Sequence, residues 1–228
     1  MKDILTIGLP SKGRLKESAL NFFKKNNLEL ASKGGDRDYF ASLNKLPNTK
    51  VIYLHAREII ERLGDGTLDI GISGLDLLNE STINLQKRIE ILKKLDFGKA
   101  NLVVAVPNDW IDVQTVADLE EVSFHFRDKK NLRLRVATKY PNVTNKFFVA
   151  KGVTQYKIVS SLGATETYPF TGSSEIITDI TSTGQTLKAN NLRVLKDGTI
   201  LVSQACILIS KKSKKKIARS DLSKSFRF

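Results

Sequence analysis

The sequence predicts an α/β fold made of two similar lobes with a central cleft. Short apolar runs bounded by turn residues alternate with amphipathic helical patterns along the 228 residues, which is typical of α/β proteins. One plan also occurs twice, at residues 66–74 and 172–180: a glycine, two residues, an acid, an apolar strand and a turn toward a helix. Ligands of such sheets bind beyond the carboxyl ends of the strands, so both turns are expected to face the cleft.

The individual elements follow from the spacing of apolar residues. A strand is expected wherever apolar residues run together, and a helix is expected at 15–26 because Leu15, Ala19 and Phe22 recur on one face. Pro107 ends the run at 101–106, since proline cannot donate to a strand ladder. In chain order the predicted elements are strand 4–9, helix 15–26, strand 51–54, helix 56–63, strand 70–73, a short helix from 75, strand 101–106, a helix near 116, strand 134–138, helix 145–151, strands 156–160 and 176–180, a helix beginning near 187, and strand 205–209.

The lobe boundaries are predicted from the connections. No linker of low complexity is present, so the lobes are expected to join through crossover strands near 95–101 and 189–193. The first lobe would then be discontinuous, formed by 1–97 and 190–228, and the second lobe would be 98–189.

The composition excludes several kinds of site. Two histidines and one cysteine cannot build a zinc finger, a disulfide framework or a Cys-x-x-Cys redox pair. His55 and His125 have no catalytic partner beside them and are interpreted as structural, and Cys206 as a small core residue. No protein metal site is predicted. Any metal would be held mainly by oxygen, which indicates Mg²⁺ carried by a phosphorylated substrate.

The sequence further indicates a cytoplasmic protein that does not enter a membrane. The run 4–9 is too short for the core of a signal peptide, and no small-residue cleavage site follows it. No apolar run approaches the roughly 20 residues that a membrane-spanning helix needs.

The net charge of +13 is unevenly distributed. Residues 211–228 contain eight Lys or Arg and one acid, a net +7, which leaves +6 for the rest of the chain. That remainder suits ligands with several phosphates, whereas the basic tail is typical of a solvated face. Since no RNP, KH or helix-turn-helix pattern is present, no nucleic-acid partner is expected.

A short turn near residue 184 gives the strongest functional signal. Turn N–H groups and a helix N-terminus converge on an anion there, the glycine lets the backbone approach it, and the threonine hydroxyls add donors. Asp179, at the end of the preceding strand, would meet the 2′ and 3′ hydroxyls of a ribose 5′-phosphate. A buried strand followed by an ordinary capped turn is the alternative. The turn consists of Thr183, Gly184, Gln185, Thr186 and Leu187.

Two other segments carry cations that could meet phosphates. Lys12 and Arg14 lie at the start of the first helix, where Ser11 can cap and Gly13 permits close approach. Cations there oppose the helix dipole, so a bound anion explains them better than a plain exposed helix start. Arg37, on a glycine-rich turn, could stabilise a leaving pyrophosphate or be an ordinary surface arginine.

The segments 95–101 and 135–140 mix small residues, amides and a cation at predicted strand edges. This mixture suits recognition of an adenine and its phosphates. Lys99, Ala137 and Thr138 are therefore the candidate ATP-binding residues.

Together these segments resemble the ATP phosphoribosyltransferase family. The turn after Asp179 is similar to the phosphoribosyl pyrophosphate (PRPP) motif of phosphoribosyltransferases, which usually has two adjacent acids where this chain has Thr178 and Asp179. The resemblance implies a two-lobed fold similar to type II periplasmic binding proteins, with PRPP held by Asp179 and the turn. It also implies that Glu166 lies near the ribose hydroxyls in place of the missing acid. The resembling stretches are 8–15, 66–76, 95–107, 135–148 and 163–210.

The family resemblance implies a defined reaction. N1 of the adenine of ATP displaces pyrophosphate from C1 of PRPP, the first step of histidine biosynthesis, with Mg²⁺ as cofactor and with Lys12, Arg14 and Arg37 near phosphates. Since the sequence ends at Phe228, it resembles the short form, which implies a regulatory subunit similar to histidyl-tRNA synthetase and a homodimer of catalytic chains. The alternative is a two-lobed solute- or effector-binding module without catalysis, since fold does not fix function.

Overall fold

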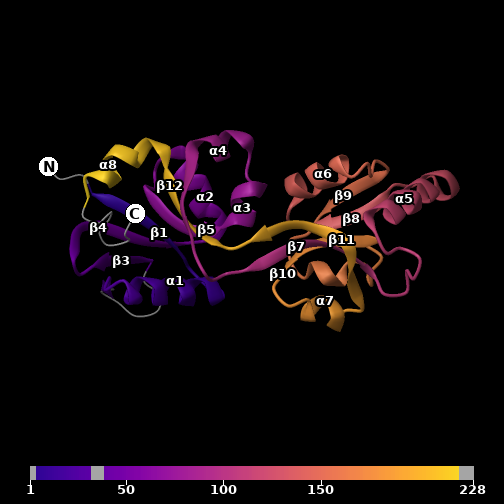
Figure 1. Cartoon of the computed structure of the whole chain (residues 1–228), viewed down its shortest axis with the longest axis horizontal. Coiled ribbons are helices and arrows are strands. Elements are labelled where there is room, and N and C mark those ends of the chain that lie inside the picture. Colours follow the sequence, from indigo (N-terminus) through magenta and orange to yellow (C-terminus); the bar gives the residue numbers. More distant parts are fainter. Residues whose placement is uncertain (1–3, 32–38, 221–228) are drawn as a thin grey trace. The chain divides into compact units, whose positions relative to one another are not determined.

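The computed structural model describes residues 4–31 and 39–220. The chain divides into two compact units (Figure 1): unit 1 comprises the described parts of 1–98 and 204–228, and unit 2 comprises 99–203. The backbone therefore passes between the units twice, after Gly98 and after Ser203.

Unit 1 contains a mixed sheet with helices on both faces (Figure 1). Its strands are β1 (Leu5–Pro10), β2 (Leu30–Ala31), β3 (Phe40–Leu43), β4 (Leu46–Leu54), β5 (Ile70–Gly74), β6 (Ile89–Lys94) and β12 (Ala205–Ser210). Its helices are α1 (Gly13–Lys25), α2 (Ala56–Asp65), α3 (Leu75–Glu80), α4 (Ile83–Arg88) and α8 (Lys214–Ala218), the last preceded by the 3-10 turn η2 (Lys211–Ser213). The strand order in the described part of the sheet is β2-β3-β4-β1-β5-β12-β6.

Unit 2 contains a second mixed sheet. Its strands are β7 (Ala100–Pro107), β8 (Leu134–Thr138), β9 (Tyr156–Ser160), β10 (Ile176–Thr181) and β11 (Leu192–Ser203). Its helices are α5 (Val116–Lys130), α6 (Pro141–Ala150) and α7 (Gln185–Ala189), and its 3-10 turn is η1 (Thr165–Thr167). The strand order is β11-β7-β10-β8-β9.

The two sheets share one topology, which confirms the prediction of two similar α/β lobes. In unit 1, β4, β1 and β5 run parallel, and β12 and then β6 are added as antiparallel neighbours. In unit 2, β9, β8 and β10 run parallel, and β7 and then β11 are added in the same way.

The repeated sequence plan also has one structural role in both units. Asp69 precedes β5, and its carboxylate accepts a hydrogen bond from the N–H of Thr6 in the adjacent strand (2.8 Å). Glu175 precedes β10, and its carboxylate accepts the equivalent bond from the N–H of Arg135 (2.6 Å). In each case the acid's own N–H returns a 3.1 Å bond to the carbonyl of the same partner residue. The acid thus fixes the register of the strand that carries the following turn.

Successive side chains along each strand of unit 2 point to opposite faces of the sheet. Ile176 of β10 and Val136 of β8 pack with Phe148 of α6. The intervening Ile177 packs on the opposite face with Leu187 of α7. Figure 1 shows α6 and α7 on opposite sides of this sheet, as that packing requires.

Local chemistry explains where several helices begin. Thr115 and Asp118 form a reciprocal capping box at α5, and the His55 side chain accepts the Arg57 N–H at α2 (3.3 Å). The helix predicted at 145–151 begins at Pro141 instead, because proline suits the first helical position. His55 therefore has a structural capping role.

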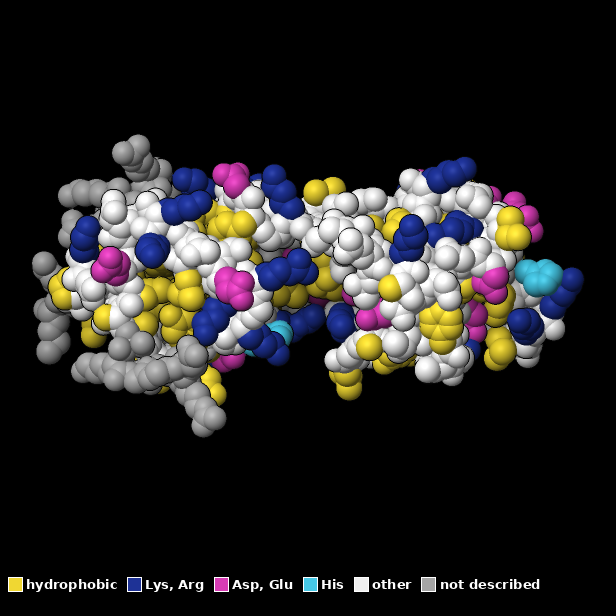
Figure 2. All heavy atoms as spheres, turned by 90° about the horizontal axis from the view of Figure 1, so that it is seen from below, with side chains coloured by type: hydrophobic (Ala, Val, Ile, Leu, Met, Phe, Trp, Pro, Cys, Tyr) yellow, Lys and Arg dark blue, Asp and Glu magenta, His cyan; other side chains and the backbone are white. Residues whose placement is uncertain are grey.

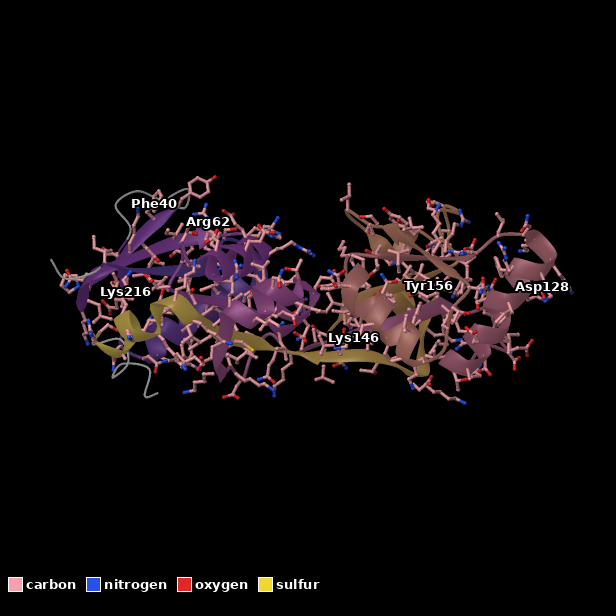
Figure 3. All side chains as sticks on the ribbon, turned by 90° about the horizontal axis from the view of Figure 1, so that it is seen from above. Phe40, Arg62, Asp128, Lys146, Tyr156 and Lys216 are labelled. Atoms are coloured by element: carbon pink, nitrogen blue, oxygen red, sulfur yellow. The ribbon has the colours of Figure 1, made fainter. Side chains whose placement is uncertain are left out.

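Helix α8 is held to unit 1 by a buried carboxylate. Asp69, 4% exposed, accepts hydrogen bonds from Ser213 (2.5 Å) and from Lys216 (2.7 Å), which Figure 3 labels on α8. Burial would raise the pKa of Asp69, but the bonds from Lys216, Ser213 and Thr6 outweigh it, so the pKa lies below its ordinary value. Part of the basic tail is therefore a packed element rather than a solvated run.

The second lobe boundary differs from the predicted one. The sequence predicts residues 190–203 in the first lobe, whereas β11 pairs along β7 within unit 2. The first boundary, between 98 and 99, lies one residue from the predicted position. Several elements were not predicted from the sequence: β2, β3, β6, β11, α4 and α8.

Within residues 4–31 and 39–220, no helix is both long and apolar enough to cross a bilayer. On the face drawn in Figure 2, Lys and Arg side chains occur on both units and are separated by acidic and uncharged ones.

Candidate functional site

The carboxyl ends of β8 and β10 bring three charged residues together in unit 2. The two strands are parallel neighbours, so both end at the same edge of the sheet. Asp179 shares its face of β10 with Ile177, the face covered by α7. Burial raises the pKa of Asp179 above its ordinary value; the N–H of Ile180 (2.8 Å) and then Lys139 lower it, and the nearby Glu166 raises it. Asp179, Glu166 and Lys139 therefore lie within electrostatic reach of one another.

This arrangement supports the predicted proximity of Glu166 to Asp179. Glu166 lies on η1 and is half-buried. Tyr168, two residues further along the chain, packs against the cluster of Ile177 and Leu187 on the α7 side of the sheet. Lys139 follows β8 directly and is also half-buried. Sequence reasoning did not select Lys139, although a cation immediately after a strand that ends beside β10 was a usable signal.

The turn after β10 contains the predicted glycine, but α7 begins at Gln185 rather than near Leu187. Gly184 adopts a left-handed conformation (φ +73°) that other residues rarely take, and it precedes α7 directly. Its N–H donates to Oγ1 of Thr181 (2.9 Å), and the N–H of Gln185 points at Oγ1 of Thr183 (3.4 Å). The threonine hydroxyls thus accept hydrogen bonds from two backbone N–H groups of the turn.

The first intrahelical bond of α7 runs from the N–H of Lys188 to the carbonyl of Gly184 (3.0 Å). The N–H groups of Thr186 and Leu187 come before that bond and lie in the first turn, where donors face the helix end. The side chains of Gln185 and Thr186 are exposed, whereas that of Leu187 is 3% exposed and belongs to the core. Leu187 can therefore contribute only its backbone to a ligand.

Thr178 explains why the usual pair of adjacent acids is incomplete. Its side chain is 0% exposed and lies on the α6 face, opposite to Asp179. Its hydroxyl shares a hydrogen bond with Thr144 of α6 (2.7 Å) and donates to Oγ1 of Thr138 (2.7 Å). A second acid at this position would be directed into the core.

The three candidate ATP-binding residues have different environments. Ala137 and Thr138 have side chains that are 0% exposed, and Oγ1 of Thr138 accepts from Thr178 and from the N–H of Tyr140. A contact from either residue to a ligand would have to come from the backbone. Lys99 is exposed and immediately precedes β7.

In unit 1 the parallel strands β4, β1 and β5 also end at one edge. Lys12 and Arg14 lie there, exposed, at the start of α1, whose first turn contains no acid. Ser11 is not the cap that the sequence suggested: the N-cap is Lys12, and the N–H of Ser11 donates to the carbonyl of Leu54 (2.9 Å). Arg37 lies outside the described residues.

The donor set does not form a dedicated metal centre. Among residues 4–31 and 39–220, no three His, Cys, Asp or Glu side chains cluster closely enough to hold an ion. Asp179 and Glu166 supply two carboxylates, which fits an ion that brings most of its ligands from a substrate. Cys206 is buried, and burial raises the pKa of its thiol, as expected for a core residue.

Comparison with solved structures supports the two-lobed architecture. The ATP phosphoribosyl transferase (HisG:HisZ) complex from Thermotoga maritima contains a chain with a TM-score of 0.74 and 26% identity, covering 98% of this chain and 96% of that one. An amino-acid ABC transporter extracellular-binding protein from Bacillus subtilis has a TM-score of 0.55 and 12% identity over 100% of this chain and 92% of that one. The second likeness concerns the fold alone, and it confirms the predicted similarity to periplasmic binding proteins.

Comparison with sequences identifies the family. ATP phosphoribosyltransferase from Nitrobacter winogradskyi is 49% identical over 93% of this chain and 66% of its own length. That from Mesorhizobium japonicum is 47% identical over 92% of this chain and 91% of its own length. The chain thus spans slightly under two thirds of the first relative and nearly all of the second. A sequence profile of ATP phosphoribosyltransferase also matches residues 55–226, so this chain belongs to the ATP phosphoribosyltransferase family.

Proposed function

We propose that this chain joins N1 of ATP to C1 of PRPP and releases pyrophosphate, the first step of histidine biosynthesis. The observation that carries the proposal is the grouping of Asp179, Glu166 and Lys139 beside the glycine turn at one edge of unit 2. Family membership supports the same reaction.

In this proposal the turn holds the 5′-phosphate of PRPP. The hydroxyls of Thr181 and Thr183 now accept N–H bonds that a phosphate oxygen would accept equally well. The exposed side chains of Gln185 and Thr186 add donors at the rim, and Leu187 contributes its N–H. Gly184 keeps the turn free of a Cβ on the ligand side.

The acids bind the ribose. Asp179 lies two residues before Thr181, so a carboxylate and the phosphate turn come from one strand end. A ribose 5′-phosphate spans that distance with its 2′ and 3′ hydroxyls toward Asp179 and Glu166. The N–H of Ile180 (2.8 Å) and then Lys139 favour the ionised, hydrogen-bond-accepting form of Asp179, although burial outweighs them and its pKa lies above the ordinary value.

The chemistry requires positioning and charge stabilisation rather than a general base. The attacking N1 is a neutral ring nitrogen, and C1 of PRPP passes through an oxocarbenium-like transition state as pyrophosphate leaves. Lys12, Arg14 and Arg37 are proposed to contact phosphates and to stabilise the departing charge. Lys99 and the backbone at Ala137 and Thr138 are proposed to bind ATP.

Mg²⁺ bound to the pyrophosphate oxygens would lower the charge that these cations must neutralise. Asp179 and Glu166 are the residues that could reach such an ion. We also propose a homodimer of catalytic chains and assembly with a regulatory subunit similar to histidyl-tRNA synthetase. The Thermotoga maritima complex, which contains HisG and HisZ, supports the hetero-oligomer.

An omission series tests the proposal. Pyrophosphate release should require ATP, PRPP and Mg²⁺ together, and removing any one should abolish it. Equal release from PRPP without ATP would contradict the assignment. Saturable binding of PRPP with no pyrophosphate release, with or without the regulatory subunit, would instead favour the non-catalytic binding module.

A further inference from the structure

Three buried threonine hydroxyls form a chain through the core of unit 2. Thr144 of α6, Thr178 of β10 and Thr138 of β8 are each 0% exposed. The hydroxyl of Thr178 shares a 2.7 Å hydrogen bond with Thr144 and donates a 2.7 Å hydrogen bond to Oγ1 of Thr138. Because a hydroxyl has one proton to donate, Thr144 is the donor to Thr178. The chain of donors therefore runs in one direction and ends at Thr138.

This chain ends beside a backbone group at the corner between β8 and α6. Oγ1 of Thr138 also accepts the N–H of Tyr140 (2.9 Å), a residue that is 6% exposed. The carbonyl of Tyr140 accepts the N–H of Thr144 (3.0 Å), and the carbonyl of Thr138 accepts the N–H of Ser161 (3.0 Å). Both backbone neighbours of Lys139 are therefore fixed.

Lys139, between these two fixed neighbours, lies at the proposed PRPP site. Strands β8 and β10 pair in parallel with Thr138 beside Thr178, so Lys139 and Asp179 are the next residues along each strand. Adjacent strands lie about 4.8 Å apart, which agrees with the electrostatic influence of Lys139 on Asp179. A half-buried cation at this edge would attract the phosphates of PRPP.

We propose that Thr138 is a positioning residue for PRPP. Its hydroxyl, oriented by Thr178, holds the backbone of Lys139 so that the ammonium group faces the substrate. The Thr138 side chain is buried and already accepts two hydrogen bonds, so it acts through Lys139 and does not touch the substrate itself. This inference rests on the proposed function. A purely structural role for the hydroxyl chain predicts different kinetics.

Thr138→Val removes the hydroxyl and keeps the branched shape of the side chain. In the full chain, with its regulatory subunit where activity requires it, this variant should raise KM for PRPP about 3- to 10-fold, the contribution of one polar contact. We expect kcat and KM for ATP to change less than about twofold, since the strand backbone is kept. Thr138→Ser keeps the hydroxyl and should restore the wild-type KM. Thr138→Ala replaces the valine variant if that variant does not fold.

Two further variants separate positioning from stability. Thr144→Val removes a buried hydroxyl at the other end of the chain but leaves both hydrogen bonds that Thr138 accepts. It should lower Tm about as much as Thr138→Val and leave KM for PRPP unchanged. Lys139→Gln should raise KM for PRPP at least as much as Thr138→Val. The double variant of Thr138→Val and Lys139→Gln should be no worse than Lys139→Gln alone, because both changes remove one contact.

A measurement without substrate separates this inference from the proposed reaction. Amide hydrogen exchange at Tyr140, followed by NMR, should become at least about 10-fold faster in Thr138→Val and stay unchanged in Thr138→Ser and Thr144→Val. Faster exchange in a chain that shows no turnover would contradict the proposed reaction and still support the ordering of this corner by Thr138. Three results would overturn the positioning role: unchanged exchange at Tyr140 in Thr138→Val, an equal rise in KM for PRPP in Thr144→Val, or additive effects in the double variant.

Discussion

Asp179→Asn is expected to lower kcat/KM for PRPP about 10- to 100-fold, because a hydrogen bond to a charged group contributes about 1.5–3 kcal/mol. The amide keeps the size of the side chain but loses the charge that the ribose hydroxyls would meet. Steady-state kinetics with PRPP varied at saturating ATP measures the effect. Glu121→Gln, an exposed carboxylate on α5 of the same unit, should leave kcat/KM unchanged.

The same substitution should raise Tm at neutral pH. Burial raises the pKa of Asp179 above 3.8, so the folded chain holds this proton more tightly than the unfolded chain. The stability that this group contributes is therefore present at low pH and is lost as the pH rises through the raised pKa. Removing the carboxylate should stabilise the fold at pH 7, and the gain should shrink as the pH falls. Unchanged kinetics in a folded variant would remove Asp179 from the site.

Thr178→Asp should destabilise unit 2 by about 3–5 kcal/mol at neutral pH, the cost of an uncompensated buried charge. The substitution restores the usual pair of acids of the PRPP motif, yet the side chain at this position faces the core beside Thr138 and Thr144. Chemical denaturation monitored by circular dichroism measures the loss. The loss should become smaller at acid pH, where the new carboxyl is protonated.

Thr178→Ser is the matched control for that prediction. It keeps the hydroxyl that links Thr138 to Thr144 and removes one buried methyl, which should cost about 1 kcal/mol. A Thr178→Asp variant that is as stable as the wild type and uses PRPP better would contradict the orientation described for β10.

The repeated lobes could be predicted because the residues that define each copy lie close together in the sequence. A glycine, an acid and an apolar strand lie within nine residues in both copies, and the acid's bond to the next strand is set by that spacing. The end of the second lobe was not predictable in the same way. Strand β11 contains two short apolar runs separated by Lys196, Asp197 and Gly198. It is held by pairing with β7, a contact between residues about 90 positions apart.

The site residues that follow a single strand could be predicted from the sequence. Those that come together from different strands were harder to predict. Asp179 and the glycine turn are adjacent in sequence, so their pattern is visible there. Lys139 joins them only because β8 and β10 end together. Thr178 and Thr138 face the core because side chains alternate along a strand and α6 covers their face of the sheet. The sequence alone does not show which face α6 covers.

The most direct test of the central claim is the identity of the product. The chain, with its regulatory subunit where activity requires it, should convert ¹⁵N-labelled ATP, PRPP and Mg²⁺ into one adduct. Its NMR spectrum should show a coupling between N1 of the adenine and C1 of the new ribose. A ribose attached to another nitrogen, or equal transfer to orotate or hypoxanthine with ATP left intact, would contradict the proposed reaction.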